Sequence, residues 1–277
     1  MSWQRKASVK RWRPGLVNIG VIVVLLAAVT FLPPDTSLRD VERAGVLRVC
    51  VPDANPPLVT GDAAAPGFDV EILQEVAQDL GVRLLLNVNS SIGRDFNPLN
   101  WRLTRANCSV IAGGVSDTRA TRGFLQTLPT GIATGWMLLS TEGAAPEQNS
   151  TVGVLPAGAG FNRLELSRFL RGKDVRPRVL QTPDQAARAL RSGEISAVIS
   201  SRFVLQNMQE EIPEATLRWM PEPPFEHHDL ALGLWKGDLT LLRAFRRSME
   251  RMERDGTLRA IGETYGISSV DAAPVEW

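Results

Sequence analysis

The sequence is poor in the side chains that most enzymes use for catalysis and in those that hold metal ions. Its 277 residues include only two His and two Cys. The histidines, His227 and His228, are adjacent, and neighbouring side chains in an extended segment point to opposite sides, so one metal ion shared between them is disfavoured. The sequence shows no Ser/His/Asp set and no phosphate-binding loop. We therefore expect no metal, no cofactor and no catalytic residue.

The two cysteines, Cys50 and Cys108, are too few for a disulfide framework or a metal cluster. Both lie in apolar, strand-like segments, which is typical of buried free thiols. Export to an oxidising compartment would instead favour a single Cys50–Cys108 bridge. The sequence leaves both interpretations open.

The charges carry no excess of one sign. The chain has 31 Lys and Arg against 30 Asp and Glu, a net charge of +1. No basic stripe runs along any segment after the first residues, so a nucleic-acid partner is not expected.

A basic leader precedes a stretch without charge. The leader cations are Arg5, Lys6, Lys10, Arg11 and Arg13. The uncharged stretch, Gly15–Leu32, would span roughly 27 Å as a helix, near the lower limit for crossing a bilayer. Because the cations precede the uncharged stretch, the leader is predicted to stay in the cytoplasm and the rest of the chain to be exported.

The leader has only a poor candidate for a cleavage site, Ala28-Val29-Thr30. We therefore predict that residues 1–34 form an uncleaved signal anchor, held in the inner membrane through residues 15–32. A cleaved signal peptide, which would leave a periplasmic protein, is the alternative.

The segment after the leader predicts a βαβ unit. Leu47–Val51 is strand-like, Pro56-Pro57 breaks the ladder, and Asp69 can cap a helix with apolar residues at 3-4 spacing. Gly81 can end that helix, and Val82–Val88 extends again. The two strands are expected to be parallel, with the first loop at the carboxyl edge of the sheet, where ligands favour binding.

Strands and helices continue to alternate through the rest of the chain. Asn100–Ala106 is predicted as a helix and Cys108–Gly114 as an apolar strand. A second series of strands and helices begins at Thr151, and a last strand and a long helix follow Asp229. The pattern predicts two α/β lobes with the chain crossing between them twice, and a small-molecule site between the lobes.

Five segments in this order resemble the extracellular solute-binding proteins of family 3, the polar amino-acid receptors of ABC importers. They are LRVCV with its double proline, GFDVEILQEVAQDLGV, CSVIAGG, VGVLPAGAG and KGDLTLLRAFRRSMERMERDGTLRAIGETYG. The resemblance implies an α/β, two-lobed type II periplasmic-binding fold with two crossover strands. By position, lobe one would hold residues 43–133 and 229–267, lobe two residues 134–228, and residues 268–277 would be a tail.

The resemblance also implies a ligand site. In the family, an Arg and a hydroxyl in the turn after the third strand bind the ligand carboxylate. Here Ser116 and Thr118 match the hydroxyl positions, and Arg119 or Arg122 would replace the guanidinium. The lobe-two turn, Gly158-Ala159-Gly160, would form a backbone nest for an anion.

The chain departs from the family at the positions that bind an α-amino acid. Ser201, followed by Arg202, stands where the family has its ammonium-binding Asp, and Asn55 and Leu58 replace the usual aromatic residues of the first loop. A hydroxyl cannot offset the desolvation of an ammonium group as a carboxylate can. A small polar or anionic solute is therefore expected, with Asn55, Ser201 and Arg202 among its contacts.

The resulting hypothesis is a solute-binding protein at the periplasmic face of the inner membrane that serves an ABC importer or another membrane partner. One alternative is an accessory factor of a periplasmic quinoprotein dehydrogenase, which the pairing of LRVCV with a later Cys-x-Val strand resembles. Another is a dehydratase-like enzyme, which would need an acid–base group in the cleft.

Overall fold

The computed structural model of the chain describes residues 17–24, 34–92, 98–143, 145–157, 161–267 and 274–277. The chain divides into two compact units, residues 1–36 and residues 37–277. In the first unit, residues 17–24 form a helix with exposed apolar side chains. The rest of the predicted anchor lies outside the described residues, and no described helix combines the length and apolar character needed to cross a membrane.

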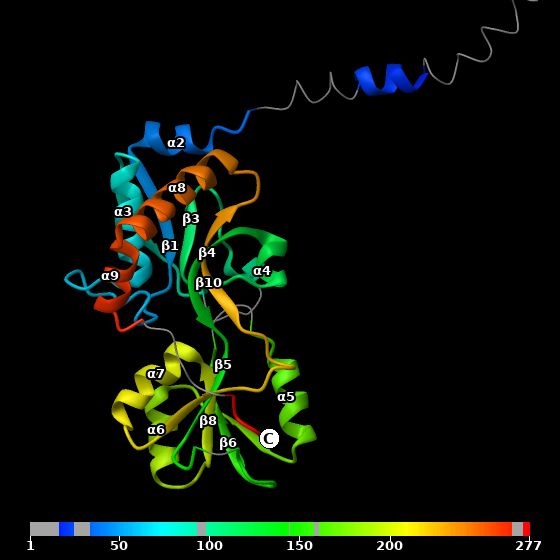
Figure 1. Ribbon diagram of the computed structural model, residues 1–277, viewed down its shortest axis with the longest axis vertical. Coiled ribbons are helices and arrows are strands. Elements are labelled where there is room, and N and C mark those ends of the chain that lie inside the picture. Colours follow the sequence, from blue (N-terminus) through cyan, green and yellow to red (C-terminus); the bar gives the residue numbers. More distant parts are fainter. Residues whose placement is uncertain (1–16, 25–33, 93–97, 144, 158–160, 268–273) are drawn as a thin grey trace, which may run out of the picture. The chain divides into compact units, whose positions relative to one another are not determined.

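The second unit contains two sheets, one above the other in Figure 1. The first sheet has the strand order β2-β1-β3-β10-β4. Its strands are β1 (Val46–Val51), β2 (Arg83–Val88), β3 (Val110–Ser116), β4 (Leu125–Thr134) and β10 (His228–Trp235). β1 pairs in parallel with β2 and β3, whereas β10 is antiparallel to β3 and β4. We call the part built on this sheet lobe one.

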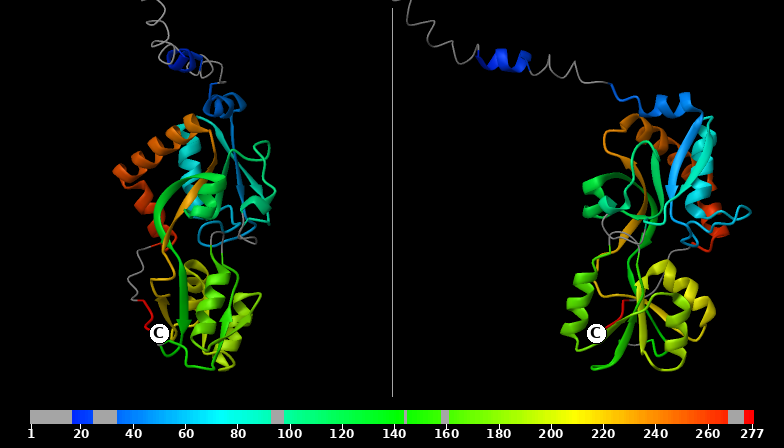
Figure 2. Two further views of the ribbon diagram at one scale, coloured as in Figure 1. Left: turned by 90° about the vertical axis from the view of Figure 1, so that its right-hand side faces the viewer. Right: turned by 180° about the vertical axis from the view of Figure 1, so that it is seen from behind.

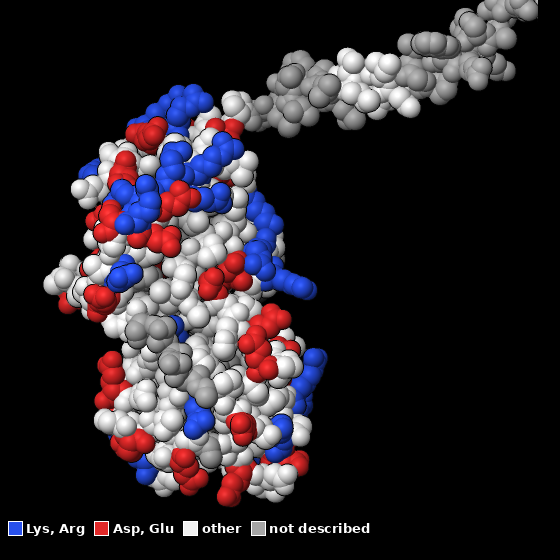
Figure 3. Space-filling model, in the orientation of Figure 1, with Lys and Arg blue, Asp and Glu red and all other residues white. Residues whose placement is uncertain are grey.

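Helices pack against both faces of the first sheet (Figures 1 and 2). They are α2 (Ser37–Ala44), α3 (Phe68–Asp79), α4 (Arg119–Phe124), α8 (Leu239–Asp255) and α9 (Thr257–Thr264), with a 3-10 turn at Pro98–Trp101. The amphipathic α8 buries one face, which includes Leu241, Phe245 and Met252, in the largest apolar cluster of the lobe. Its other face is charged, and Figure 3 shows both signs interspersed over this end of the molecule.

The second sheet has the order β7-β6-β8-β5-β9, and the part built on it is lobe two. Its strands are β5 (Trp136–Ser140), β6 (Thr151–Val154), β7 (Arg176–Val179), β8 (Ala197–Ser201) and β9 (Thr216–Trp219). Its helices are α5 (Arg163–Gly172), α6 (Pro183–Arg191) and α7 (Arg202–Glu211). The chain enters lobe two at β5, stays in its apolar core through Met220 and Phe225, and returns to lobe one in β10. The predicted two-lobed α/β fold is confirmed.

The segment after α9 also reaches lobe two. Val275 N–H donates to the carbonyl oxygen of Trp219 at 2.8 Å. The ring of Trp277 packs edge-on against Phe169 of α5, with ring centroids 5.2 Å apart. Residues 274–277 therefore belong to the packing of lobe two although they follow the last helix of lobe one in sequence.

The predicted βαβ unit is present, with one correction. β1 and β2 pair in parallel from Val46 and Arg83 onward, and Gly81 ends the helical segment with a φ of 65°. The prediction that Asp69 caps α3 is wrong, because Gly67 is the N-cap and Asp69 is the second residue of the helix. The Asp69 side chain is buried and accepts a hydrogen bond from the backbone of Gly113 in β3 instead.

The predicted helix at Asn100–Ala106 is also wrong. Only a 3-10 turn ending at Trp101 forms there, and Arg102 has a left-handed φ of 53° that no α-helix can continue through. The Trp101 side chain is fully buried beside the two cysteines. Tertiary packing of this indole therefore decides the conformation of the segment.

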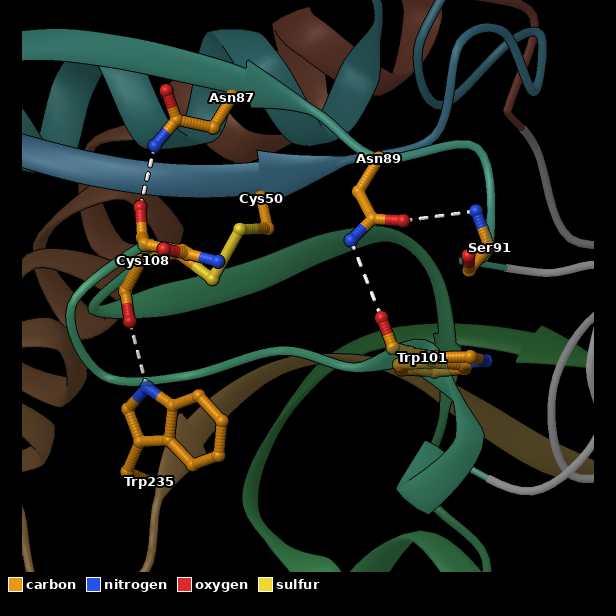
Figure 4. Close-up of a disulfide and its surroundings, with 8 residues drawn as sticks. Cys50, Asn87, Asn89, Ser91, Trp101, Cys108 and Trp235 are labelled. Carbon is orange, nitrogen blue, oxygen red and sulfur yellow. Dashed lines mark hydrogen bonds between the residues drawn. A yellow bond between two sulfur atoms is a disulfide. The ribbon is translucent and has the colours of Figure 1, made fainter.

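Cys50 and Cys108 form a disulfide (Figure 4). Of the two interpretations that the sequence left open, the single bridge is therefore confirmed and the pair of free thiols is wrong. Cys50 of β1 and Cys108, just before β3, are both buried in an apolar cluster with Trp101 and Trp235. The indole N–H of Trp235 donates to the Cys108 carbonyl oxygen at 2.7 Å. The bridge secures the segment that leads into β3, the strand that ends at the site described next.

Candidate functional site

A cavity of about 200 Å³ lies between the lobes. Lobe one contributes the loop after β1 and the carboxyl end of β3. Lobe two contributes the turn after β6 and the first turn of α7. The cavity lies at the carboxyl ends of strands in both sheets, the region where the sequence analysis expects a small-molecule site.

A glycine pair in β3 shapes the lobe-one wall. Gly113 and Gly114 have φ values of 85° and 108°, in the region that favours glycine. A Cβ on Gly113 would overlap the ring of Pro52, and one on Gly114 would overlap the amide nitrogen of Asn55. The close approach lets Asn55 Nδ2 donate to the Gly113 carbonyl oxygen at 3.1 Å, which fixes the predicted site residue Asn55 in the cavity wall.

Asp69 supports the same pair from behind. Its Oδ2 accepts the N–H of Gly113 at 2.7 Å. Burial raises the pKa of Asp69 to about 6, and the hydrogen bonds from Gly113 and Gly114 only partly offset this effect. The carboxyl group thus couples the start of α3 to the backbone that lines the cavity.

Ser116 ends β3 and lines the cavity. Its side chain is 1% exposed, and Oγ has no hydrogen-bond partner in the part of the chain that the structure describes. Such a buried, unsatisfied hydroxyl calls for an explanation, and a bound solute would supply one. Thr118, the other predicted hydroxyl, is outside the described cavity lining and caps α4 by accepting the Thr121 N–H at 3.2 Å.

Neither predicted ligand arginine of the turn is brought into this cavity. Arg119 is exposed, and Arg122 pairs through Nη1 with Asp117 Oδ2 at 3.0 Å while its side chain stays 53% exposed. Both are absent from the described lining. The described geometry therefore gives no support to a guanidinium contact from either residue.

The predicted nest at Gly158-Ala159-Gly160 lies outside the described residues. The two residues before it, Pro156 and Ala157, do line the cavity. Pro156 is tied to the end of β8, because the Ser200 hydroxyl donates to its carbonyl oxygen at 3.1 Å.

Ser201 and Arg202 have different positions although they are adjacent. Ser201 lines the cavity as the N-cap of α7, and its side chain makes no capping hydrogen bond. Arg202 is 1% exposed and outside the described lining. Its Nη1 donates to the Ala133 carbonyl oxygen of β4 at 2.7 Å, and its Nε donates to Gln206 Oε1 at 3.0 Å. Arg202 thus joins the start of α7 to the strand that crosses between the lobes.

The remaining electrostatics of the site are simple. Burial lowers the pKa of Arg202 to about 10, so the guanidinium remains charged at neutral pH. Asp53, exposed in the first loop, is the one charged side chain in the described lining. Among the described residues, no group of three or more His, Cys, Asp and Glu side chains could hold a metal ion.

The sequence did not point to four lining residues that complete the site: Ser90, Thr134, Phe161 and Phe203. Phe203 lies just after the carboxyl end of β8, and this position is the signal that could have pointed to it. The phenylalanines give lobe two the aromatic wall that the first loop lacks. Phe203 also packs into the apolar cluster of lobe one, so the two lobes share a buried contact beside the cavity.

Comparison with known proteins agrees with this architecture. The family model for bacterial extracellular solute-binding proteins, family 3, matches residues 47–268. The chain belongs to this family. Among its relatives, the L-cystine-binding protein TcyJ of Escherichia coli K12 is 27% identical over 267 residues, covering 89% of this chain and 93% of that protein. The predicted family is confirmed.

Solved structures support the fold of this family 3 protein. The ancestral amino-acid-binding protein AncCDT-1, described as a precursor of cyclohexadienyl dehydratase, has a TM-score of 0.65 at 18% identity, covering 83% of this chain and 99% of that one. A substrate-binding protein of an ABC uptake transporter from Streptococcus pneumoniae, solved with bound histidine, also has a TM-score of 0.65, at 15% identity and 83% and 96% coverage. At these identities the likeness concerns the fold alone.

Proposed function

We propose that this family 3 protein captures a small polar or anionic solute between its lobes and delivers it to an ABC importer or another membrane partner. The Ser116 hydroxyl, which is buried in the wall of an interlobe cavity and has no hydrogen-bond partner among the described residues, is the observation that carries the proposal. We assign Asn55, Ser116 and Ser201 as contacts of the solute, because all three line that cavity. The L-cystine binding named for TcyJ makes an amino acid or a related small acid a reasonable first class to test.

Capture by lobe closure requires that the solute touch both lobes, since a ligand populates the closed state only if it binds that state better. The cavity meets this requirement, because its polar groups come from both sheets. The lobes also meet directly, where Asn207 Nδ2 of α7 donates to the Pro56 carbonyl oxygen of the first loop at 3.2 Å. A bound solute would add its own contacts to this small existing interface.

We place the protein at the periplasmic face of the inner membrane. The exposed apolar side chains of residues 17–24 follow a run of leader cations, as in a signal anchor. The buried disulfide supports a location outside the reducing cytoplasm.

Binding is tested by thermal shift of the full-length protein in detergent, with amino acids including cystine, small organic acids and polyols. We expect at least one compound to raise the melting temperature in a concentration-dependent way, because a ligand that binds only the folded state stabilises it. The matched control is Ala54→Trp, which places a large ring at an exposed position of the cavity lining.

The control should fold normally and lose the shift. If no compound shifts the wild type, the capture function is refuted. Recovery of a stable dehydrogenase complex that no solute affects would favour the accessory role instead.

A further inference from the structure

The start of α7 differs from the starts of the neighbouring helices in lobe two. Asn162 and Thr182 cap α5 and α6 with their side chains, whereas Ser201 makes no such bond to α7. The first N–H groups of an α-helix have no acceptor within the helix. In α7 they include those of Phe203 and Val204, two residues that line the cavity. An uncapped helix start of ten residues therefore faces the solute site.

A second, independent feature lies on the lobe-one wall of the same cavity. Ser116 is 1% exposed, comes from a different sheet, and has no partner for Oγ among the described residues. A hydroxyl can donate one hydrogen bond to a bound oxygen. The two lobes thus present donors to one cavity, and lobe closure would bring both sets onto one acceptor group.

The electrostatics favour an acceptor with negative charge. A helix start carries a partial positive charge, which stabilises anions within the first turn. Arg202 adds a full positive charge in that turn, held by the Ala133 and Gln206 oxygens. The described carboxylate of the lining, Asp53, lies on the opposite side, in the exposed loop of lobe one.

The rest of the cavity suits a short organic group. Phe161 and Phe203 supply apolar walls, and Asn55 and Thr134 supply polar ones. The volume of about 200 Å³ restricts the occupant to a small molecule.

Resting on the proposed function, we propose that the solute is a small carboxylic acid whose carboxylate binds between the start of α7 and the Ser116 hydroxyl. In this arrangement the Phe203 and Val204 N–H groups and Ser116 Oγ donate to the carboxylate oxygens. The carboxylate then joins the two lobes, and its organic part lies against Phe161.

The test compares matched acids and amides by titration calorimetry with the full-length protein. The probes are acetate, lactate and pyruvate, their amides acetamide and lactamide, and the amine ethanolamine. We expect the acids to bind and the amides to bind at least 10-fold more weakly, because an amide lacks the charge that the helix start stabilises.

Three variants separate the two donor sets. Ser116→Ala should weaken acid binding at least about 10-fold, by removing one hydrogen bond to a charged group. Ser201→Asp should weaken it at least 10-fold, because the new carboxylate caps α7 and repels the acid. Ser201→Ala removes one hydroxyl of the lining but keeps the N–H groups, so it should weaken acid binding much less than Ser201→Asp does.

The same set of variants includes controls for loss of folding. Asp is a favourable N-cap residue, so Ser201→Asp should not lower the melting temperature. Thr182→Asp makes the same exchange at the cap of α6, away from the cavity, and should leave acid binding unchanged.

The outcomes distinguish the two proposals. If ethanolamine or the amides bind and the acids do not, the carboxylate site is wrong while solute capture stands. If Ser201→Asp binds acids as tightly as the wild type, the carboxylate site is also wrong. If none of these probes and no compound of the wider thermal-shift panel binds, both proposals fail.

Discussion

Removal of the disulfide tests how much of the fold depends on one cross-link. The perturbation is the double substitution Cys50→Ala with Cys108→Ala. The bridge closes a sequence separation of 58 residues, for which loop-closure entropy gives a stabilisation of about 4 kcal/mol at 25 °C. A typical domain has only about 5–15 kcal/mol of stability, so the double variant should lose a large fraction of its free energy of unfolding.

The contacts around the bridge should survive the substitution, which isolates the effect of the cross-link. The Trp235 indole bonds to the backbone carbonyl of Cys108 and not to its sulfur. Trp101 and Ile111 keep their place in the surrounding cluster, apart from the small loss of packing against two sulfur atoms.

The assay is urea denaturation of the full-length protein at pH 7, followed by tryptophan fluorescence, with and without reductant. We expect the midpoint to fall in the double variant and in the reduced wild type, and reductant to have no effect on the double variant. A loss below about 1 kcal/mol in the variant would refute the loop-entropy reasoning.

Three further predictions concern groups around the site. Burial raises the pKa of Asp69 from its ordinary value of 3.8 to about 6, so the folded state must give up a proton that the unfolded state has already lost, and stability should fall by roughly 3 kcal/mol as pH rises from about 4 to about 6. Asp69→Asn should flatten this part of the stability curve in urea titrations, and an unchanged slope would contradict the assignment. Gly113→Ala, at a φ of 85°, should cost about 1–3 kcal/mol in the same assay, whereas Gly123→Ala, with no atom within 4 Å of the added Cβ, should cost less than about 0.5 kcal/mol. Arg202→Met should cost about 1–3 kcal/mol by removing the charged donor to the half-buried Ala133 carbonyl, and a stability equal to the wild type would show that the contact between α7 and β4 is dispensable.

Local signals predicted the elements whose structure depends on their own residues. The 3-4 spacing of α3 and the glycine stop at Gly81 both have the expected structure, since each acts within one or two turns of chain. Asp69 failed as a cap because the backbone of β3, distant in sequence, competes for its carboxylate. Asn100–Ala106 failed because burial of Trp101 beside the disulfide outweighs helix propensity.

The site was predictable on one lobe more than on the other. Asn55 and Ser116 follow strands of the first sheet, so sequence order alone places them at its carboxyl edge. The orientation of Arg202 depends on where α7 meets β4, a contact between segments about seventy residues apart that no local pattern encodes. The contribution of Phe161 and Phe203 likewise depends on how closely the lobes approach.

The attachment of residues 274–277 to lobe two limits how far the protein can open. Ile267 is packed in the apolar cluster of lobe one, and Val275 is bonded to Trp219 of lobe two. Eight residue steps lead from Ile267 to Val275 and reach at most about 29 Å when fully extended, so this third covalent link limits the hinge angle. A wider opening of the lobes must first break the contacts of Val275 and Trp277 with lobe two. The release of a captured molecule should therefore depend on the last few side chains.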